Sequence, residues 1–297
     1  MIGILGAGSL GRLWAALLPP GQVCYLPRPE QPAPPSLHYV LHTPEQHTRA
    51  VTLPPLADAS ALTLLLVTTK AGDTLSAVTA WLPKIPPRVP VVLFQNGLGS
   101  QQAVAEHFPE RPLLAASTTE GANRPDAATL IHAGRGETWI GALTGAAGPV
   151  LEDSVRILSA SGLILHATEH IHERLWQKLV INAGINPFTA ILNCRNGELP
   201  DAPLFRRHIR PLCAEIAALM AAAGVAQPSA EELQAQIEAV ARRTAANTSS
   251  MLADVRQGRK TEIDYSNGYL VQLGSELGIP TPVNRMLTGQ VRQLSPH

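Results

Sequence analysis

The 297-residue chain combines a large apolar content with balanced charge, and both properties exclude classes of protein. Hydrophobic residues make up 45% and charged residues 15%, so the chain can bury a sizeable core and is not expected to be disordered. The 23 basic residues match 23 acidic ones, which leaves no net field to attract nucleic acid or an anionic membrane. Four of the basic residues are lysine, so each lysine invites a functional explanation.

The cysteines and the first residues bear on location. Cys24, Cys194 and Cys213 lie far apart and form no CxxC pair, which fits a reducing cytoplasm and argues against disulfides and a zinc site. The apolar start lacks a basic leading region and is interrupted by Arg12, so no secretory signal is predicted. No apolar run approaches the roughly 18 residues of a membrane span. We expect a soluble cytoplasmic protein without a metal.

The first half alternates short apolar runs with helical patterns, which is typical of βαβ units in a parallel sheet. Strands are predicted at 2–5, 23–26, 62–67 and 91–94, and a helix at 9–18. Two later runs among glycines, 129–132 and 138–140, are predicted to pair and close the sheet.

From about residue 169 the pattern becomes mostly helical. Helices are predicted at 173–193, 204–223, 230–256 and 262–277, followed by a short terminal one. Pro187 and Pro211 fall inside the first two, which we expect to be kinked or broken there. The predicted fold is therefore α/β: a Rossmann-type doubly wound sheet in residues 1–168, followed by an all-helical domain in 169–297.

A GxGxxG run follows the first predicted strand and opens the first predicted helix. It consists of Gly6, Ala7, Gly8, Ser9, Leu10 and Gly11. The first glycine allows a tight turn, the second lets backbone approach a pyrophosphate, and the third lets helix and strand pack closely. The alternative is a tight turn without a ligand, but the position inside a βαβ unit favours a dinucleotide.

The end of the second predicted strand bears on which dinucleotide binds. NAD enzymes usually place an acid there to hold the ribose 2′-hydroxyl, whereas this strand runs into Pro27 and Arg28. Arg28 can pair with a 2′-phosphate, so NADP is favoured. Glu30 nearby keeps NAD open as the alternative, as does a solvated Arg28.

Polar residues follow two more strands, and ligands bind at the carboxyl ends of strands in open parallel sheets. Lys70 ends the Thr-Thr-Lys run after the strand at 62–67, and Asn96 begins Asn-Gly after the strand at 91–94. We predict that both contact the cofactor. The alternatives are a solvated lysine and an ordinary turn.

The helix predicted at 173–193 carries a polar stripe on an apolar background. Lys178, Asn182 and Asn186 are spaced by four residues and share one face. Polar groups on a buried helix cost stability unless they meet partners or a polar ligand. A narrow solvent-facing stripe is the alternative. Ser250 and Asp254 are also spaced by four residues, and Glu262 follows them in the chain. Helix capping and surface charge explain these three residues equally well.

These residues resemble ketopantoate reductase (2-dehydropantoate 2-reductase), the NADPH enzyme of pantothenate and coenzyme A synthesis. The matching motifs are GAGSLG at 6–11, TTK at 68–70, QNGLG at 95–99, LWQKLVINAGINPFTAILNCRNGEL at 175–199 and SSMLADVRQGRKTEIDYSNGYL at 249–270. They keep the family's order and spacing over essentially the whole chain. The resemblance implies reduction of ketopantoate to (R)-pantoate by a monomer or homodimer.

The resemblance also implies roles for individual residues. Lys178 corresponds to the catalytic lysine that gives a proton to the reduced carbonyl oxygen, and Glu262 to the acid at the active centre. Substrate-binding positions are Asn96, Asn182, Asn186, Asn196 and Ser250. Cofactor-binding positions are Gly6 to Gly11, Arg28, Lys70, Asn96, Ala122 and Glu262.

The chemistry fits these assignments. Hydride transfer to a keto carbon creates negative charge on its oxygen, which a lysine can both stabilise and protonate, whereas arginine does not readily yield a proton. Two departures from the family stand out: Glu120 follows Thr118-Thr119, where an acid would alter affinity for an anionic substrate, and prolines flank Arg28. Two other functions stay open, a related NADP-dependent 2-keto or hydroxy acid dehydrogenase and a non-catalytic NADP-binding redox sensor.

Overall fold

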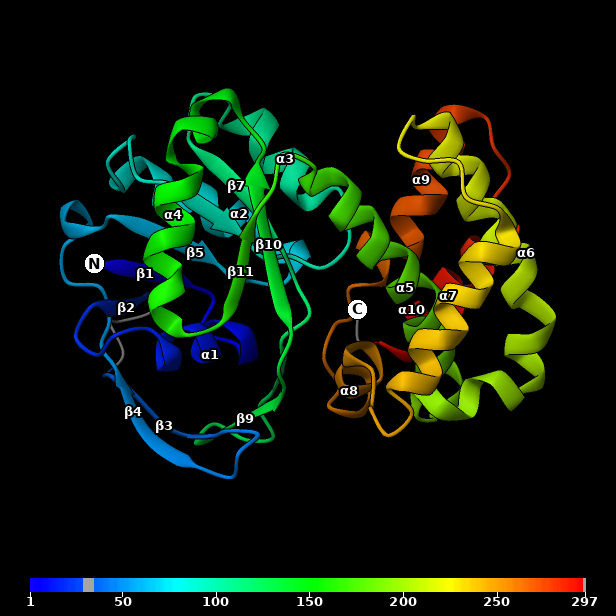
Figure 1. The fold of residues 1–297 in the computed structure, drawn as a ribbon, viewed down its shortest axis with the longest axis horizontal. Coiled ribbons are helices and arrows are strands. Elements are labelled where there is room, and N and C mark those ends of the chain that lie inside the picture. The colour runs from blue at the N-terminus through cyan, green and yellow to red at the C-terminus, as the bar shows by residue number, and fades with distance from the viewer. Residues whose placement is uncertain (29–34, 296–297) are drawn as a thin grey trace. The chain divides into compact units, whose positions relative to one another are not determined.

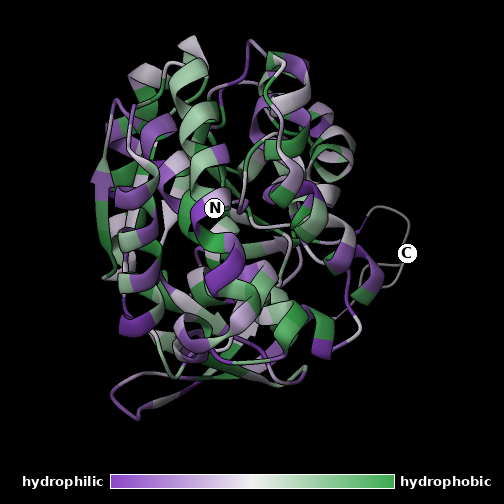
Figure 2. Ribbon diagram, turned by 90° about the vertical axis from the view of Figure 1, so that its right-hand side faces the viewer, coloured by the Kyte–Doolittle hydropathy of each residue, from purple (hydrophilic) through white to green (hydrophobic). Residues whose placement is uncertain are grey.

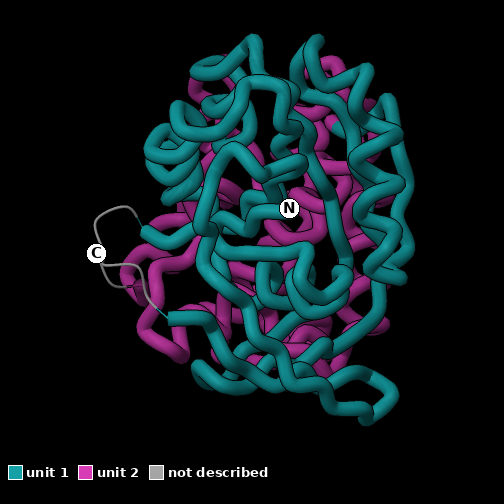
Figure 3. Tube along the Cα trace, turned by 90° about the vertical axis from the view of Figure 1, so that its left-hand side faces the viewer, with its two compact units in different colours: residues 1–95, 100–171 teal, residues 96–99, 172–297 magenta. Residues whose placement is uncertain are grey.

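The computed structural model describes residues 1–28 and 35–295. The described chain forms two compact units, 1–95 with 100–171 and 96–99 with 172–297 (Figure 3). The short segment Asn96–Gly99 thus belongs to the second unit, although both of its neighbours in sequence belong to the first. Glu30, which bore on the choice between NAD and NADP, lies outside the described residues.

The first unit is built on two sheets. Its strands are β1 (Ile2–Leu5), β2 (Val23–Leu26), β3 (Leu37–His42), β4 (Thr48–Leu53), β5 (Leu64–Val67), β6 (Val91–Leu93), β7 (Leu113–Thr118), β8 (Gly121–Asn123), β9 (Thr129–Gly134), β10 (Glu137–Ala142) and β11 (Ile164–Ala167). Within the described residues the larger sheet has the order β11-β10-β7-β6-β5-β1-β2 and the smaller one β4-β3-β9-β8 (Figure 1).

The larger sheet is parallel from β2 to β7, as the apolar runs predict. Helices α1 (Ser9–Leu17), α2 (Ala71–Trp81), α3 (Ser100–His107) and α4 (Leu151–Leu158) accompany it. Alternate residues of β5 enter different cores: Leu64 and Leu66 pack with Leu13 of α1, whereas Leu65 packs with Val78 of α2. A sheet buried on both faces by helices is the doubly wound arrangement, so the predicted fold class is confirmed.

One prediction for this unit is wrong. The runs at 129–132 and 138–140 do not pair with each other, because β9 joins the smaller sheet between β3 and β8 while β10 lies antiparallel to β7 in the larger one. Both runs have strand character, but the partner of a strand is set by long-range packing that local pattern does not carry.

The second unit is helical. Its helices are α5 (Ile171–Leu192), α6 (Pro203–Ala222), α7 (Ala230–Arg243), α8 (Ser250–Arg256), α9 (Asn267–Leu277) and α10 (Pro282–Leu294). In Figure 2 green and purple residues mix along the helices, as in helices with one buried side. Helix α7 begins with a capping box formed by Ser229 and Glu232. None of the helices in the described residues is long and apolar enough to cross a bilayer.

Three expectations for the helices need correction. Pro187 and Pro211 lie inside α5 and α6 and break neither helix, so the break is wrong and a kink at either proline stays a prediction. The helix predicted at 230–256 is two helices, α7 and α8, separated at 244–249. The helix predicted at 262–277 begins instead with a short 3₁₀ turn, Ile263–Tyr265, before α9. Ser250 and Asp254 therefore lie in a short helix of their own, and Glu262 stands just before the 3₁₀ turn.

Candidate active site

The glycine loop of the first unit has the geometry that each glycine was predicted to provide. Gly6 has φ +101°, and a Cβ there would lie 2.5 Å from the backbone nitrogen of Thr69. A Cβ on Gly11 would lie 2.5 Å from the Gly6 carbonyl oxygen, so only glycine lets α1 start this close to β1. A Cβ on Gly8 would meet no described atom within 4 Å. The backbone is thus tightly packed at Gly6 and Gly11, whereas the space beside Gly8 is open.

The N-terminus of α1 fits the same ligand. Gly8 is its N-cap, and among the described residues no side chain caps it, so its first N–H groups are not used by a side chain. The loop is braced from β5, where Thr68 Oγ1 donates to the Gly6 carbonyl oxygen at 2.6 Å. Free N–H groups, the helix dipole and open space at Gly8 together suit the pyrophosphate of a dinucleotide.

Arg28 and Lys70, the two predicted cationic cofactor residues, also belong to the first unit. Arg28 is exposed just after β2, and the Pro27 carbonyl oxygen before it accepts a hydrogen bond from Trp81 Nε1 of α2 at 3.1 Å. Lys70 is half-buried and forms the N-cap of α2. Ala122 is a half-buried residue of β8 that packs against the core beside α1.

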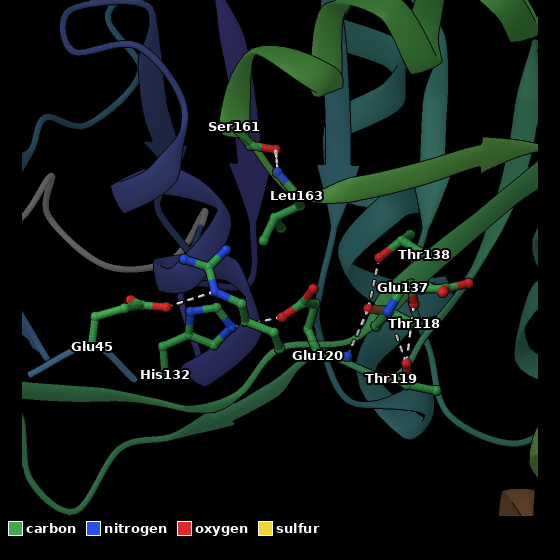
Figure 4. Close-up of polar contacts among 10 residues, drawn as sticks. Glu45, Thr118, Thr119, Glu120, His132, Glu137, Thr138, Ser161 and Leu163 are labelled. Carbon is green, nitrogen blue, oxygen red and sulfur yellow. Dashed lines mark hydrogen bonds and ion pairs between the residues drawn. The ribbon is translucent and has the colours of Figure 1, made fainter. Parts of the chain in front are cut away.

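Glu120 was expected to influence an anionic substrate, but its carboxylate is buried inside the first unit. Its side chain is 1% exposed and lies 2.6 Å from Nε2 of His132, whose side chain is 3% exposed (Figure 4). Its other oxygen, Oε1, is buried without a hydrogen-bond partner among the described residues. The pair joins the segment after β7 to β9, so Glu120 anchors the backbone between Thr118 and Ala122 rather than presenting a charge to a ligand.

Replacing His132 by alanine is expected to lower the free energy of unfolding by about 3–5 kcal/mol, because it leaves the buried Glu120 carboxylate without its partner. The matched control is Arg135→Ala, which removes an exposed ion pair with Glu45. That change should leave stability nearly unaltered. Denaturant unfolding followed by circular dichroism compares the two, and equal effects would contradict the importance of burial.

The second unit contains a pocket that brings together most of the predicted substrate residues. It is lined by Asn96, Gly97, Asn182, Asn186, Ser250, Met251, Asp254, Glu262 and Ser266. A wider hollow lies beside α10, but Arg285 is the one charged residue that lines it, so it lacks an acid–base pair.

Helix α5 supplies one wall of the pocket. Asn182 and Asn186 are both half-buried and lie one turn apart, as their spacing predicts. Thr189, a further turn along, donates to the Asn186 carbonyl oxygen at 2.8 Å and lies 2.6 Å from Ser249 Oγ. Ser249 in turn caps α8 by accepting from the Leu252 N–H. This chain of contacts fixes Ser250, the first residue of α8, opposite the polar face of α5.

The opposite wall carries the acid. Glu262 Oε2 accepts a hydrogen bond from Asn96 Nδ2 at 3.1 Å. The segment after Asn96 is fixed to the same part of the unit, since the Leu98 N–H donates to the Tyr265 carbonyl oxygen at 2.9 Å. Two motifs that are 166 residues apart in the chain therefore meet in one hydrogen bond.

Lys178 lies one turn before Asn182 on α5 and is half-buried. Burial lowers the pKa of Lys178 to about 8, and the nearby charge of Glu262 opposes that shift. A lysine with this pKa remains mostly protonated at neutral pH but yields its proton more readily than an ordinary lysine. Lys178 is not among the residues that line the pocket, but a lysine of lowered pKa under the influence of a nearby carboxylate has the properties of a proton donor.

Asn196 is the predicted substrate residue that the structure does not bring into this lining. It is buried at the start of the 3₁₀ turn Asn196–Asp201, and its Nδ2 donates to Thr244 Oγ1 at 2.9 Å. Its backbone N–H donates to the Asn247 carbonyl oxygen at 3.1 Å. Here Asn196 joins the loop after α5 to the loop after α7, and its predicted contact with substrate rests on the resemblance alone.

The pocket also includes residues that were not among the predicted site residues. Asp254, which is buried, accepts from Arg259 Nε at 2.9 Å, and its spacing of four from Ser250 was the available signal. Ser266 directly follows the 3₁₀ turn, and Gly97 has a left-handed backbone conformation. A periodic sequence pattern predicts neither position. In the described residues no group of three or more side chains is arranged to hold a metal.

Family models support this reading of the sequence. Residues 2–145 match the model described as ketopantoate reductase PanE/ApbA, and residues 170–295 match its C-terminal model. A 2-dehydropantoate 2-reductase of Yersinia pestis is 35% identical over 96% of this chain and 92% of its own length. The chain belongs to the ketopantoate reductase family of oxidoreductases. The family's 2-dehydropantoate 2-reductase from Escherichia coli O157:H7 is 36% identical over 98% of this chain and 94% of its own length.

Solved structures agree with the family. A PanE/ApbA family ketopantoate reductase from Ralstonia eutropha has a TM-score of 0.84 at 26% identity, covering 99% of this chain and 98% of its own. D-mandelate dehydrogenase, solved with NADH and anilino(oxo)acetate, has a TM-score of 0.87 at 22% identity, covering 99% of this chain and 98% of its own. At that identity the second likeness shows the fold alone. The family predicted from the motifs is confirmed.

Proposed function

We propose that the protein reduces 2-dehydropantoate to (R)-pantoate with NADPH, with Lys178 as the proton donor. The observation that carries the proposal is the pocket of the second unit, where Asn182 and Asn186 continue the face of Lys178 and Glu262 lies near the lysine's charge. The proposal assigns cofactor binding to residues 1–168 and substrate binding to 169–297, with Asn96 also lining the substrate pocket.

The glycine loop would hold the cofactor. Gly8 leaves open space before the uncapped start of α1, which fits a pyrophosphate, and Arg28 would pair with a 2′-phosphate after β2. Lys70 would add a second cation at the end of β5. When bound, NADPH supplies the hydride that the keto carbon receives.

The residues of the second unit would supply the rest of the chemistry. Lys178 Nζ donates a proton to the keto oxygen as that oxygen gains negative charge, so the carbonyl becomes an alcohol and the lysine becomes neutral. Asn182, Asn186 and Ser250 offer amide and hydroxyl groups that bind carboxylate and hydroxyl without neutralising the lysine. Glu262 holds Asn96 through its Nδ2 and keeps the lysine protonated in the resting enzyme.

The test is NADPH oxidation followed by absorbance, with ketopantoate as substrate and with NADH and other 2-keto acids beside it. We expect rapid turnover with NADPH and ketopantoate and much slower turnover with NADH, since NADH lacks the 2′-phosphate that Arg28 would hold. Faster turnover with a different 2-keto acid than with ketopantoate would mean that this other acid is the substrate. Tight NADPH binding without any turnover would favour a redox sensor.

A further inference from the structure

Two arginines of the first unit converge on the glycine loop. Arg12, on α1, donates its Nε–H to the Ala7 carbonyl oxygen at 3.1 Å and a terminal N–H to the Ala127 carbonyl oxygen at 2.8 Å. Arg124, just after β8, reaches the same Ala7 oxygen at 3.4 Å. One carbonyl group of the loop thus brings two guanidinium groups together.

No carboxylate balances these charges in the residues that the structure describes, since neither Arg12 nor Arg124 forms an ion pair there. Burial lowers the pKa of Arg12, and the positive charge of Arg124 lowers it further. The guanidinium of Arg12 also lies 5.0 Å from the centre of the Tyr39 ring. Two like charges side by side in a partly desolvated place are costly unless an anion joins them.

The two arginines differ in their burial and in how many hydrogen bonds their guanidinium groups make within the protein. Arg12 is 7% exposed, and its bonds to Ala7 and Ala127 tie the glycine loop to the segment after β8. Arg124 is half-buried and makes one long hydrogen bond to the loop, so most of its five donors remain for another acceptor. Beside it lie the open space at Gly8 and the uncapped start of α1.

We propose that Arg124 binds the pyrophosphate of the dinucleotide held at the glycine loop, and that Arg12 is a positioning residue for that loop. This rests on the dinucleotide-binding part of the proposed function. Ala7 lies in the turn between β1 and α1, where the pyrophosphate of a dinucleotide sits, whereas the ribose phosphate belongs at the end of β2 near Arg28. Guanidinium groups suit phosphate because their paired donors match two phosphate oxygens.

The test measures dissociation constants of NADPH and NADH by quenching of tryptophan fluorescence, with no keto acid present. Arg124→Gln is expected to weaken both dinucleotides alike, by about 10- to 100-fold, because both contain the pyrophosphate. Arg124→Lys should lose less, since it keeps the charge without the paired donors. The matched control is Arg28→Gln, which should weaken NADPH alone.

Two results would overturn the assignment. If Arg124→Gln keeps the melting temperature of the parent protein and both dissociation constants stay within about twofold, Arg124 does not bind the cofactor. If NADPH alone is weakened, Arg124 contacts the 2′-phosphate instead. A parent protein that binds NADPH but does not reduce ketopantoate would refute the proposed reaction and leave this comparison intact, whereas one that binds neither dinucleotide would refute both.

Discussion

Replacing Lys178 by alanine is expected to lower kcat by about 10²- to 10⁴-fold while changing NADPH affinity little. The lysine lies on α5 in the second unit, whereas the glycine loop that would hold the cofactor lies in the first. Without Nζ the keto oxygen has no cation beside it and no proton donor with a pKa near neutrality. Turnover and NADPH binding are measured on the same protein samples.

The pH dependence should report the same group. Because burial lowers the pKa of Lys178 to about 8 in the free protein, and the protonated form is the donor, kcat/KM for reduction should be flat below that pH and fall tenfold per unit above it. Lys178→Arg is the matched control, since it keeps the positive charge but cannot yield a proton, and it should restore substrate binding without restoring turnover. Undiminished turnover in Lys178→Ala would mean that another residue is the proton donor.

The fold of the first unit could be predicted largely because buried parallel strands leave a strong local signal. The segments that form β1, β2, β5 and β6 are fully buried and contain no charged residue, and their burial on both faces requires this. The small sheet could not be predicted in the same way. Its strands β3 and β4 mix exposed polar with buried apolar residues, and its third partner β9 is about 90 residues further along the chain.

The helical unit shows where periodicity stops being informative. The stretch at 244–249 contains no proline or glycine, and the pattern therefore predicts one helix where the structure has α7 and α8. The interruption is stabilised by contacts from outside the helix: the Asn247 carbonyl oxygen accepts from the Asn196 N–H, and Ser249 starts α8 as an N-cap. Conversely, Pro187 predicts a kink or a break in α5, but the helix continues through it without a break.

The candidate site was predictable where it follows helical spacing and hidden where it depends on tertiary contact. Asn182 and Asn186 share a face by spacing alone, and the structure places both in the pocket. The hydrogen bond between Asn96 and Glu262 has no local signal, and it was the resemblance that put both residues at one centre. Glu120 shows the converse, since an acid that was expected to alter affinity for an anionic substrate is buried against His132.

Gly97→Ala is expected to lower kcat/KM by about 100-fold or more, because it displaces the turn that positions Asn96. Gly97 has φ +80°, which already disfavours any other residue. A Cβ there would also lie 1.9 Å from the Tyr265 carbonyl oxygen, a backbone atom that cannot rotate away. Since that same oxygen accepts the Leu98 N–H, the segment cannot keep both its hydrogen bond and the added methyl group. Asn96 would then lose its place beside Glu262.

Gly224→Ala is the matched control, because it introduces the same backbone strain as Gly97→Ala without a steric clash. Gly224 also has a positive φ, +67°, but a Cβ there would meet no described atom within 4 Å. This control should cost about 1–2 kcal/mol of stability and leave kcat/KM unchanged. Thermal unfolding and steady-state kinetics on both variants make the comparison. Equal activity in Gly97→Ala and Gly224→Ala would mean either that the turn at Gly97 does not determine the position of Asn96 or that turnover does not need the hydrogen bond between Asn96 and Glu262.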